Sequence, residues 1–424
     1  MNPHTIKKVT LKFYVITIVT LLALFGLYWF LTHTFLTIEA SPVNAYVTIN
    51  NAPVKLSRTG KVRKILAPGS YAIKIEAEGY ISHIEEIELK RAQRKTVQVQ
   101  LPEVPRAVTV TDRGQFLSQD SDFNTIRYLG DNGSTIYRAK ILLDGNGEVQ
   151  IKNIARLTEP KLTGIEEIIW SPTGDLALFR KKNGIYIFDF KKYDFISQTE
   201  SLWGTNIGSA AWAPDNSKIA YYYEPGTGEK SLIFANIANT ETTRVANLAE
   251  AGIENPILRW SPDSEWLLVI PRSTKYENND IYLFNAYSRT FKRLTSGGNK
   301  LDAIFSQDNN KILVSTYSKD DGSPVRSVIS VVNTDGSNMQ ELNIRADVRK
   351  VAWNNDANGL TIATYNPLNQ AESLFGYNIA KREKSNFVIN KIDQGFIYSL
   401  LASNDGKIVI YETKEGIFAL KVGD

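Results

Sequence analysis

The stretch IIWSPTGD at residues 168–175 decides the fold, because the chain repeats it. In every copy, an apolar run ends in a large side chain and is followed by a turn of Pro, Asp, Asn, Ser or Gly. The large side chains of successive copies are 42–48 residues apart, a period typical of repeat architectures. The other copies are AWAPDNSK at 211–218, RWSPDSE at 259–265, FSQDN at 305–309, WNND at 353–356 and LASNDG at 401–406.

Each turn leads into runs that have the composition of β-strands. After the copy at 259–265 come WLLVI at 266–270, DIYLF at 280–284 and the polar run TFKRLT at 290–295. Short runs of β-branched and aromatic residues, separated by turns, predict four antiparallel strands per repeat. One four-stranded sheet cannot bury both of its faces, so we expect the sheets to pack as the blades of a closed ring.

The first repeat is degenerate. Residues 134–158 match the third and fourth strands of a blade. FLSQD at 116–120, which precedes them, resembles a degenerate copy of the turn motif. We therefore expect a first blade that starts near residue 112.

The last repeat is incomplete, because its runs near 407–412 and 416–422 are not followed by a fourth strand. The run AVTVT at 107–111 can supply that strand and join the two ends of the chain in one blade. We predict seven blades; six is the alternative, if 112–160 is an insertion.

These repeats resemble the WD40-like and TolB-type propeller repeat, whose hallmark is an aromatic-Ser-Pro-Asp-Gly core. The resemblance covers roughly residues 107–424, although the copies after residue 300 lack the Pro. It implies a β-propeller but no particular function, since propellers host enzymes, receptors and scaffolds. The fixed position of the large residues favours packing between blades over ligand stacking. The repeat residues are Trp170, Pro172, Trp212, Pro214, Trp260, Pro262, Phe305 and Trp353.

Several kinds of chemistry are excluded by composition. The chain has no Cys, which rules out disulfides, thiolate catalysis and Cys-ligated metals. Its three histidines, His4, His33 and His83, lie outside the repeats, so the propeller holds no Ser-His-Asp triad and no His-ligated metal. The propeller's positive and negative charges are balanced, so the sequence predicts no basic surface for nucleic acid. We predict no enzyme activity, no catalytic residues, no metal and no cofactor, although paired carboxylates that could cleave glycans stay open.

The segment from Phe13 to Ile38 contains no charged side chain, and Lys7, Lys8 and Lys12 precede it. We expect a membrane-spanning helix over 13–36, since about 20 apolar residues cross a bilayer. The basic flank predicts that residues 1–12 are cytoplasmic and that 39–424 are extracytoplasmic. A cleaved signal peptide is the alternative, but the run is long and lacks a good cleavage site.

Residues 37–101 alternate in hydrophobicity with period two, as in SYAIKIEA at 70–77, and predict a small antiparallel β-sandwich. LAPGSY at 66–71, AEGY at 77–80 and the opening SPVNAYVTIN at 41–50 resemble the PEGA domain, a surface-layer-associated β module. The resemblance implies a bacterial host and an adhesion or spacer role outside the cell. Residues 102–106 are then a short linker.

Two groups of basic residues stand out in this region. The simpler interpretation is solvated charge on loops and edge strands. The sharper one is contact with anionic lipid head groups or an anionic wall polymer. The residues are Arg58, Lys61, Arg63 and Lys64 in the first group, and Lys90, Arg91, Arg94 and Lys95 in the second.

The sequence thus predicts an all-β, single-pass membrane protein that displays a sandwich and a propeller outside the cell as a binding or scaffold module. Its expected partner is an envelope protein or a wall polymer. The alternative is a carboxylate-dependent, glycan-cleaving or lyase-type propeller, which needs two or three acids at one mouth of the channel. A third hypothesis is a sensor with inverted topology. Aromatic residues near predicted loops are binding candidates, namely Tyr193, Trp203, Tyr276 and Tyr287.

Overall fold

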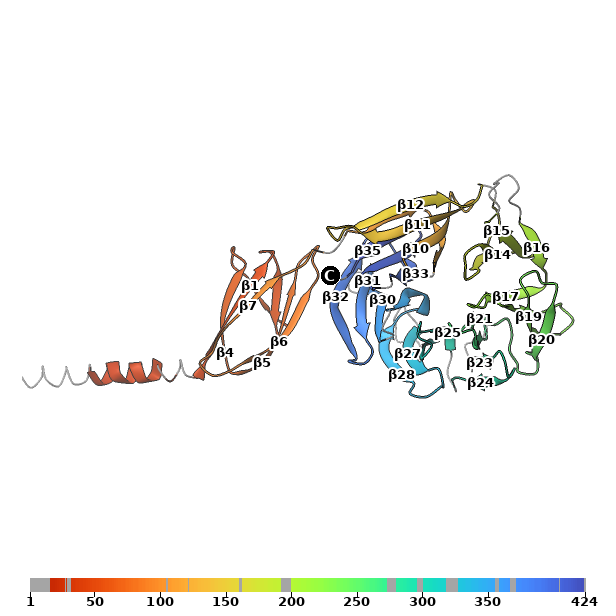
Figure 1. The fold of residues 1–424 in the computed structure, drawn as a ribbon. Helices are drawn as coiled ribbons and strands as arrows, with labels where there is room; N and C mark the ends of the chain where they lie inside the picture. Colours follow the sequence, from red (N-terminus) through yellow and green to blue (C-terminus); the bar gives the residue numbers. More distant parts are fainter. Residues whose placement is uncertain are drawn as a thin grey trace, which may run out of the picture. The chain divides into compact units, whose positions relative to one another are not determined.

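A computed structural model of the chain divides into two units, residues 1–104 and 105–424. Each is described by itself below (Figure 1). The structure describes residues 16–26, 28, 32–103, 106–120, 122–159, 162–191, 200–272, 280–295, 300–317, 327–354, 358–366, 371–403 and 405–422. The expected cytoplasmic tail and the candidates Tyr193 and Tyr276 lie outside these residues.

The first described segment, residues 16–26, is helical, and strand β1 begins at Thr34. The expectation of a helix over 13–36 is therefore wrong at its end, because residues 34–36 pair with two other strands and Leu36 lies in a hydrophobic core. Residues 13–15, 27 and 29–31 are not described. Within the described part of the chain, no helix is both long and apolar enough to cross a membrane.

The first unit contains two sheets around one core, in the orders β3-β2-β5-β6 and β4-β1-β7. Period-two alternation explains the core, since Ile73 and Ile75 of one strand are both fully buried. The sandwich is not wholly antiparallel, because β1 runs parallel to β7. The strands are β1 (Thr34–Ser41), β2 (Tyr46–Ile49), β3 (Ala52–Val54), β4 (Lys61–Leu66), β5 (Gly69–Glu76), β6 (His83–Leu89) and β7 (Arg94–Gln100).

The described residues of the second unit form seven four-stranded sheets, which we call blades 1 to 7. In Figure 1 they follow one another around a ring. Blades 1 to 3 contain β9 (Gln115–Gln119), β10 (Thr125–Gly130), β11 (Thr135–Leu143), β12 (Val149–Arg156); β13 (Glu167–Trp170), β14 (Leu176–Lys181), β15 (Gly184–Asp189), β16 (Ser201–Gly204); and β17 (Ile207–Trp212), β18 (Ile219–Tyr223), β19 (Ser231–Ala235), β20 (Thr242–Asn247).

Blades 4 to 7 repeat this arrangement, and blade 7 takes its outermost strand from the start of the unit. They contain β21 (Ile257–Trp260), β22 (Trp266–Ile270), β23 (Tyr282–Asn285), β24 (Phe291–Arg293); β25 (Lys300–Phe305), β26 (Lys311–Tyr317), β27 (Ser327–Asn333), β28 (Gln340–Arg345); β29 (Val351–Trp353), β30 (Gly359–Asn366), β31 (Ala371–Asn378), β32 (Glu383–Ile392); and β33 (Ile397–Ala402), β34 (Ile408–Thr413), β35 (Gly416–Lys421) with β8 (Val108–Asp112).

The ring closes as the sequence predicts. β8 pairs antiparallel with β35, with Thr109 opposite Phe418 and Thr111 opposite Ile417. Hydrophobic clusters lie between consecutive blades from blade 7 through blade 1 to blade 6. In the cluster between blades 3 and 4, Trp260 is buried and its Nε1 donates to the Ala211 carbonyl oxygen of the neighbouring blade at 3.0 Å. Trp212 and Trp353 are buried in the equivalent clusters between blades 2 and 3 and between blades 5 and 6, so these repeated tryptophans pack between neighbouring blades.

The recurrent motif is the turn between the first and second strands of a blade. In blade 5, the buried Ser306 hydroxyl donates to Asp308 at 2.6 Å and accepts the Lys311 backbone N–H at 2.9 Å. The residue after the Asp, here Asn309, has φ +60°. That left-handed conformation favours Gly and Asn, and the equivalent residues with positive φ are Gly174, Asn216, Ser264 and Gly406.

Blade 1 differs from the expected register. Residues 116–120, which we interpreted as the turn, mostly belong to β9, and the turn lies at 120–125. Asp120 takes the place of the motif's Ser, and Phe123 carries the positive φ of +56°. The Asp120 carboxylate forms an ion pair with Arg127, which lies 4.6 Å from the Trp170 ring centroid.

Replacing the turn serine tests this account of the motif. We expect Ser306→Ala to lower the free energy of unfolding by about 1–2 kcal/mol, because the partly buried backbone N–H of Lys311 loses its acceptor. Ser337→Ala is the matched control, since Ser337 makes the same kind of bond to Asp335 in an exposed turn. Urea unfolding followed by tryptophan fluorescence would measure both variants. Equal stability losses would contradict a special role for the motif serine.

Candidate functional site

The innermost strands of the propeller bring charged residues from different blades together. The first strands are innermost, since β13 contacts β17, β17 contacts β21 and β29 contacts β33. In each blade, the first strand starts and the second strand finishes at the same edge of the sheet. The motif turn joins the two strands at the opposite edge. We call the end of the propeller opposite the motif turns the mouth.

Two arginine–carboxylate pairs lie at the mouth. Arg259 of β21 reaches Asp302 of β25 with both terminal nitrogens, one at 3.1 Å, and also donates to the Ala303 carbonyl at 2.6 Å. Arg180 of β14 lies 3.1 Å from Glu167 of β13 through Nε and donates to the Gly208 carbonyl of blade 3 at 3.1 Å. Each arginine therefore crosses from its own blade to the next.

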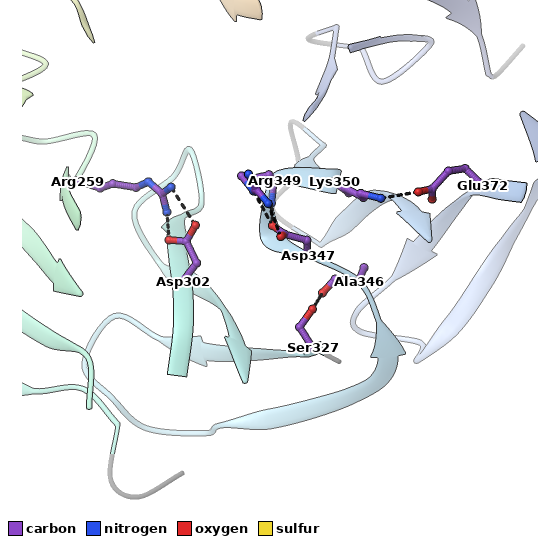
Figure 2. A network of polar contacts seen from close by, with 8 residues as sticks. All are labelled: Arg259, Asp302, Ser327, Ala346, Asp347, Arg349, Lys350 and Glu372. Carbon is purple, nitrogen blue, oxygen red and sulfur yellow. Dashed lines mark hydrogen bonds and ion pairs between the residues drawn. The ribbon is translucent and has the colours of Figure 1, made fainter. Parts of the chain in front are cut away.

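A third pair stands on the short connection between blades 5 and 6, which contains the 3-10 turn η1 (Val348–Lys350). Arg349 donates to Asp347 through Nε at 3.1 Å and Nη2 at 2.8 Å, a bidentate geometry. Burial alone would raise the pKa of Asp347, but hydrogen bonds from the Arg349 side chain and backbone outweigh burial and leave the pKa below its ordinary value. Figure 2 shows this pair beside Arg259 and Asp302.

A fourth pair joins the last residue of η1 to blade 6. The ammonium of Lys350 contacts Glu372 of β31, whose side chain is 0% exposed. The second carboxylate oxygen, Oε2 of Glu372, has no hydrogen-bond partner among the described residues. This pair fixes the connection to the third strand of blade 6, as Figure 2 shows.

Electrostatics link the mouth across the ring. Arg272 follows β22 of blade 4, and burial lowers the pKa of its guanidinium, while Glu167 of blade 2 and Asp302 of blade 5 oppose that shift. Asp302 also raises the pKa of Arg349, after the larger effect of Asp347. Charges from blades 2, 4 and 5 and from the connection between blades 5 and 6 therefore act on one another at the mouth.

A cavity of about 350 Å³ opens beside this group. Its polar wall is Asp347, Arg349 and Lys350, and its aromatic wall is Tyr365 at the end of β30 with Phe396 and Tyr398 at the start of β33. The Tyr365 and Phe396 rings are stacked, with centroids 5.7 Å apart. The Ser327 hydroxyl donates to the Ala346 carbonyl at 2.8 Å and closes one edge.

The aromatic candidates from the sequence lie elsewhere. Trp203 is not a surface residue of a loop: it is buried in β16, where its Nε1 donates to the Ile237 carbonyl at 2.7 Å. Tyr287 is exposed, but it lies between β23 and β24, at the end of blade 4 opposite the mouth. Sequence reasoning missed Phe396 and Tyr398, which lie just before a degenerate copy of the motif.

The basic residues of the sandwich partly come together. Because β4 and β7 flank β1, Lys64 and Lys95 both lie opposite Leu36, and Arg94 lies opposite Phe35, with its guanidinium 5.8 Å from that ring's centroid. The other predicted residues are more scattered. Arg63 lies one position along β4, Lys61 pairs with Glu39 at 2.7 Å, Arg58 precedes β4, and Lys90 and Arg91 lie in the turn before β7.

Metal ligands are not gathered in the described residues, where no group of three or more His, Cys, Asp or Glu side chains could hold an ion.

Comparison with known proteins identifies the first unit and the fold of the second. Residues 33–105 match the PEGA domain family. No curated protein sequence matches the chain. The chain is similar to the hydrazine synthase of Kuenenia stuttgartiensis, with a TM-score of 0.50 and 13% identity over 74% of this chain and 97% of that one.

Two other solved structures are similar. One is an oligogalacturonate lyase in complex with manganese, with a TM-score of 0.49 and 12% identity over 75% of this chain and 98% of that one. The other is a putative TolB from Agrobacterium tumefaciens, with a TM-score of 0.40 and 15% identity over 64% of this chain and 95% of that one. At such identities the likeness concerns the fold alone.

Proposed function

We propose that this chain, which joins a PEGA domain to a TolB-like β-propeller, is a membrane-attached binding or scaffold protein. The propeller engages an envelope protein or a wall polymer outside the cell through its mouth. The observation that carries the proposal is the group of ion-paired side chains from blades 2, 4 and 5 and from the connection between blades 5 and 6, next to a cavity of about 350 Å³. A concave site with a few fixed polar groups is typical of binding sites.

The state of the carboxylates argues against a role as general acid. Glu167, Asp302 and Asp347 are each paired with an arginine. The lowered pKa of Asp347 keeps it ionised at neutral pH, and an ionised carboxylate cannot donate a proton as a general acid. Rigid arginine–carboxylate pairs instead present fixed donors and acceptors to a partner.

Membrane attachment rests on the sequence. The apolar run that precedes β1 carries Lys7, Lys8 and Lys12 on its N-terminal side, which orients the following residues outward. Lys64, Arg94 and Lys95 lie near the start of β1, the strand that follows the run directly. Basic side chains there would add attraction to an anionic membrane surface of about 1 kcal/mol each.

Two experiments on the full-length chain in intact cells test this proposal. We expect external protease to degrade the propeller without lysis, and we expect crosslinking followed by purification to retain one recurrent envelope component. The double variant Arg259→Ala/Asp302→Ala should lose that component, whereas Tyr287→Ala should keep it. Protection of the propeller from protease would overturn the outward orientation, and equal capture by both variants would overturn the role of the mouth.

A carboxylate enzyme is the second candidate, because Glu167, Asp302 and Asp347 do lie at one mouth. Such an enzyme would release new reducing or unsaturated ends from wall glycan, and Asp302→Asn would abolish the release. If glycan were bound but not cleaved, the enzyme hypothesis would be wrong and only the binding function would remain.

A further inference from the structure

We propose that the cavity between blades 5, 6 and 7 binds an uncharged pyranose unit of a glycan. This inference rests on the proposed function and names the class of ligand. Its starting point is the pair of walls that face the same cavity, one aromatic and one a planar ion pair.

The aromatic wall is unusually exposed. Phe396 is 55% exposed and Tyr398 is 49% exposed, although both are large and apolar side chains. Phe396 is held in place by stacking on Tyr365, with an angle of 24° between the two ring planes. Because more than half of Phe396 stays exposed beside this stack, it offers apolar aromatic surface to a ligand. The C–H face of a pyranose carries small positive charges and therefore packs on the negative face of an aromatic ring.

The polar wall suits hydroxyl groups. The Asp347–Arg349 pair is bidentate and planar, and the side chain of Arg349 remains 65% exposed. A guanidinium donor next to a carboxylate acceptor matches the vicinal hydroxyl groups of a sugar, since each hydroxyl both donates and accepts. Hydrogen bonds to charged groups are also stronger than those between neutral groups.

Charge and size select the class of ligand. Of the charged lining residues, Arg349 is balanced by Asp347 and Lys350 is balanced by the buried Glu372 outside the lining, so no unpaired charge is left to attract an anion. A volume of about 350 Å³ lies at the small end of the range of about 300–1,000 Å³ for ligand sites. One or two sugar units fit such a volume better than a folded protein segment does.

Binding of neutral and acidic oligosaccharides to the full-length chain in nanodiscs tests this proposal. The probes are an array of neutral hexose and N-acetylhexosamine tetramers, with tetragalacturonate as the charged counterpart, followed by calorimetry on each hit. We expect a neutral tetramer to bind and tetragalacturonate not to. Phe396→Ala and Tyr398→Ala should each weaken binding by about tenfold, as the loss of one stacking contact implies.

The controls separate the cavity from general effects. Tyr287→Ala removes an exposed tyrosine at the opposite end of a blade and should leave binding unchanged. Arg349→Lys keeps the charge, loses the bidentate geometry and should weaken binding. If no neutral glycan binds, or if Phe396→Ala and Tyr398→Ala bind as the native chain does, the inference is wrong. If crosslinking still captures an envelope protein in that case, the proposed function stands without it.

Discussion

Gly416→Ala is expected to open the propeller ring and to lower the free energy of unfolding by about 3 kcal/mol. Gly416 starts β35 with φ +151°, and a Cβ atom there would lie 2.2 Å from the Thr111 carbonyl oxygen of β8. Backbone cannot yield as a flexible side chain can, so β8 must move away from β35. Since β8 is the fourth strand of blade 7, its loss exposes the core between blades 7 and 1.

Gly145→Ala is the matched control, because a Cβ atom there meets nothing within 4 Å. Urea unfolding followed by tryptophan fluorescence reports mainly on the propeller, since it holds six of the seven tryptophans and the seventh is Trp29. If both variants were as stable as the native chain, β8 would not close the ring.

Lys350→Ala is expected to cost about 3–5 kcal/mol of folding free energy, because it leaves the carboxylate of Glu372 buried without its cation. The side chains of Lys350 and Glu372 are 20% and 0% exposed. The double variant Lys350→Met/Glu372→Leu removes both charges, and we expect it to recover most of the loss. Lys381→Ala breaks a pair with Glu383 whose side chains are 70% and 61% exposed, and should cost less than about 1 kcal/mol.

Urea unfolding of the native chain and these three variants compares the loss of a buried ion pair with the loss of an exposed one. If Lys350→Ala were no more harmful than Lys381→Ala, the pair would not anchor the wall of the cavity.

The fold could be predicted from sequence because its signals are local and repeated. A turn that needs a positive φ at its fourth residue restricts the side chain at that position, and this restriction recurs at Gly174, Asn216, Ser264, Asn309 and Gly406. Closure by residues 107–111 followed from counting strands. Blade 1 was misplaced in register, because Asp120 and Phe123 take the positions of Ser and Gly.

The end of the N-terminal helix could not be placed from hydrophobicity. Leu36 and Ile38 are as apolar as membrane residues, but they alternate with Phe35 and Thr37 in a strand. Because the run from 13 to 38 is uncharged throughout, hydrophobicity alone does not show where the helix ends and where the first strand of the sandwich begins.

The mouth could not be predicted from the sequence, because two of its ion pairs join residues of different elements that are far apart in the sequence. Arg259 and Asp302 are 43 residues apart, and Lys350 and Glu372 belong to different elements. One signal was available: the residue before the large motif side chain is Ile169, Ala211, Ile304 and Ala352 in other copies, and only Arg259 is charged among these five. A charged residue at a position that is apolar in the other copies indicates a side chain with a specific partner.

The most direct test of the central claim, that the mouth is the binding surface, is site-specific photo-crosslinking in intact cells. A photoreactive amino acid would replace Tyr398 beside the cavity in one variant and Tyr287 at the opposite end in another. We predict a recurrent crosslink to an envelope component from position 398 and none from position 287. Crosslinks of equal yield from both positions, or from position 287 alone, would contradict the account.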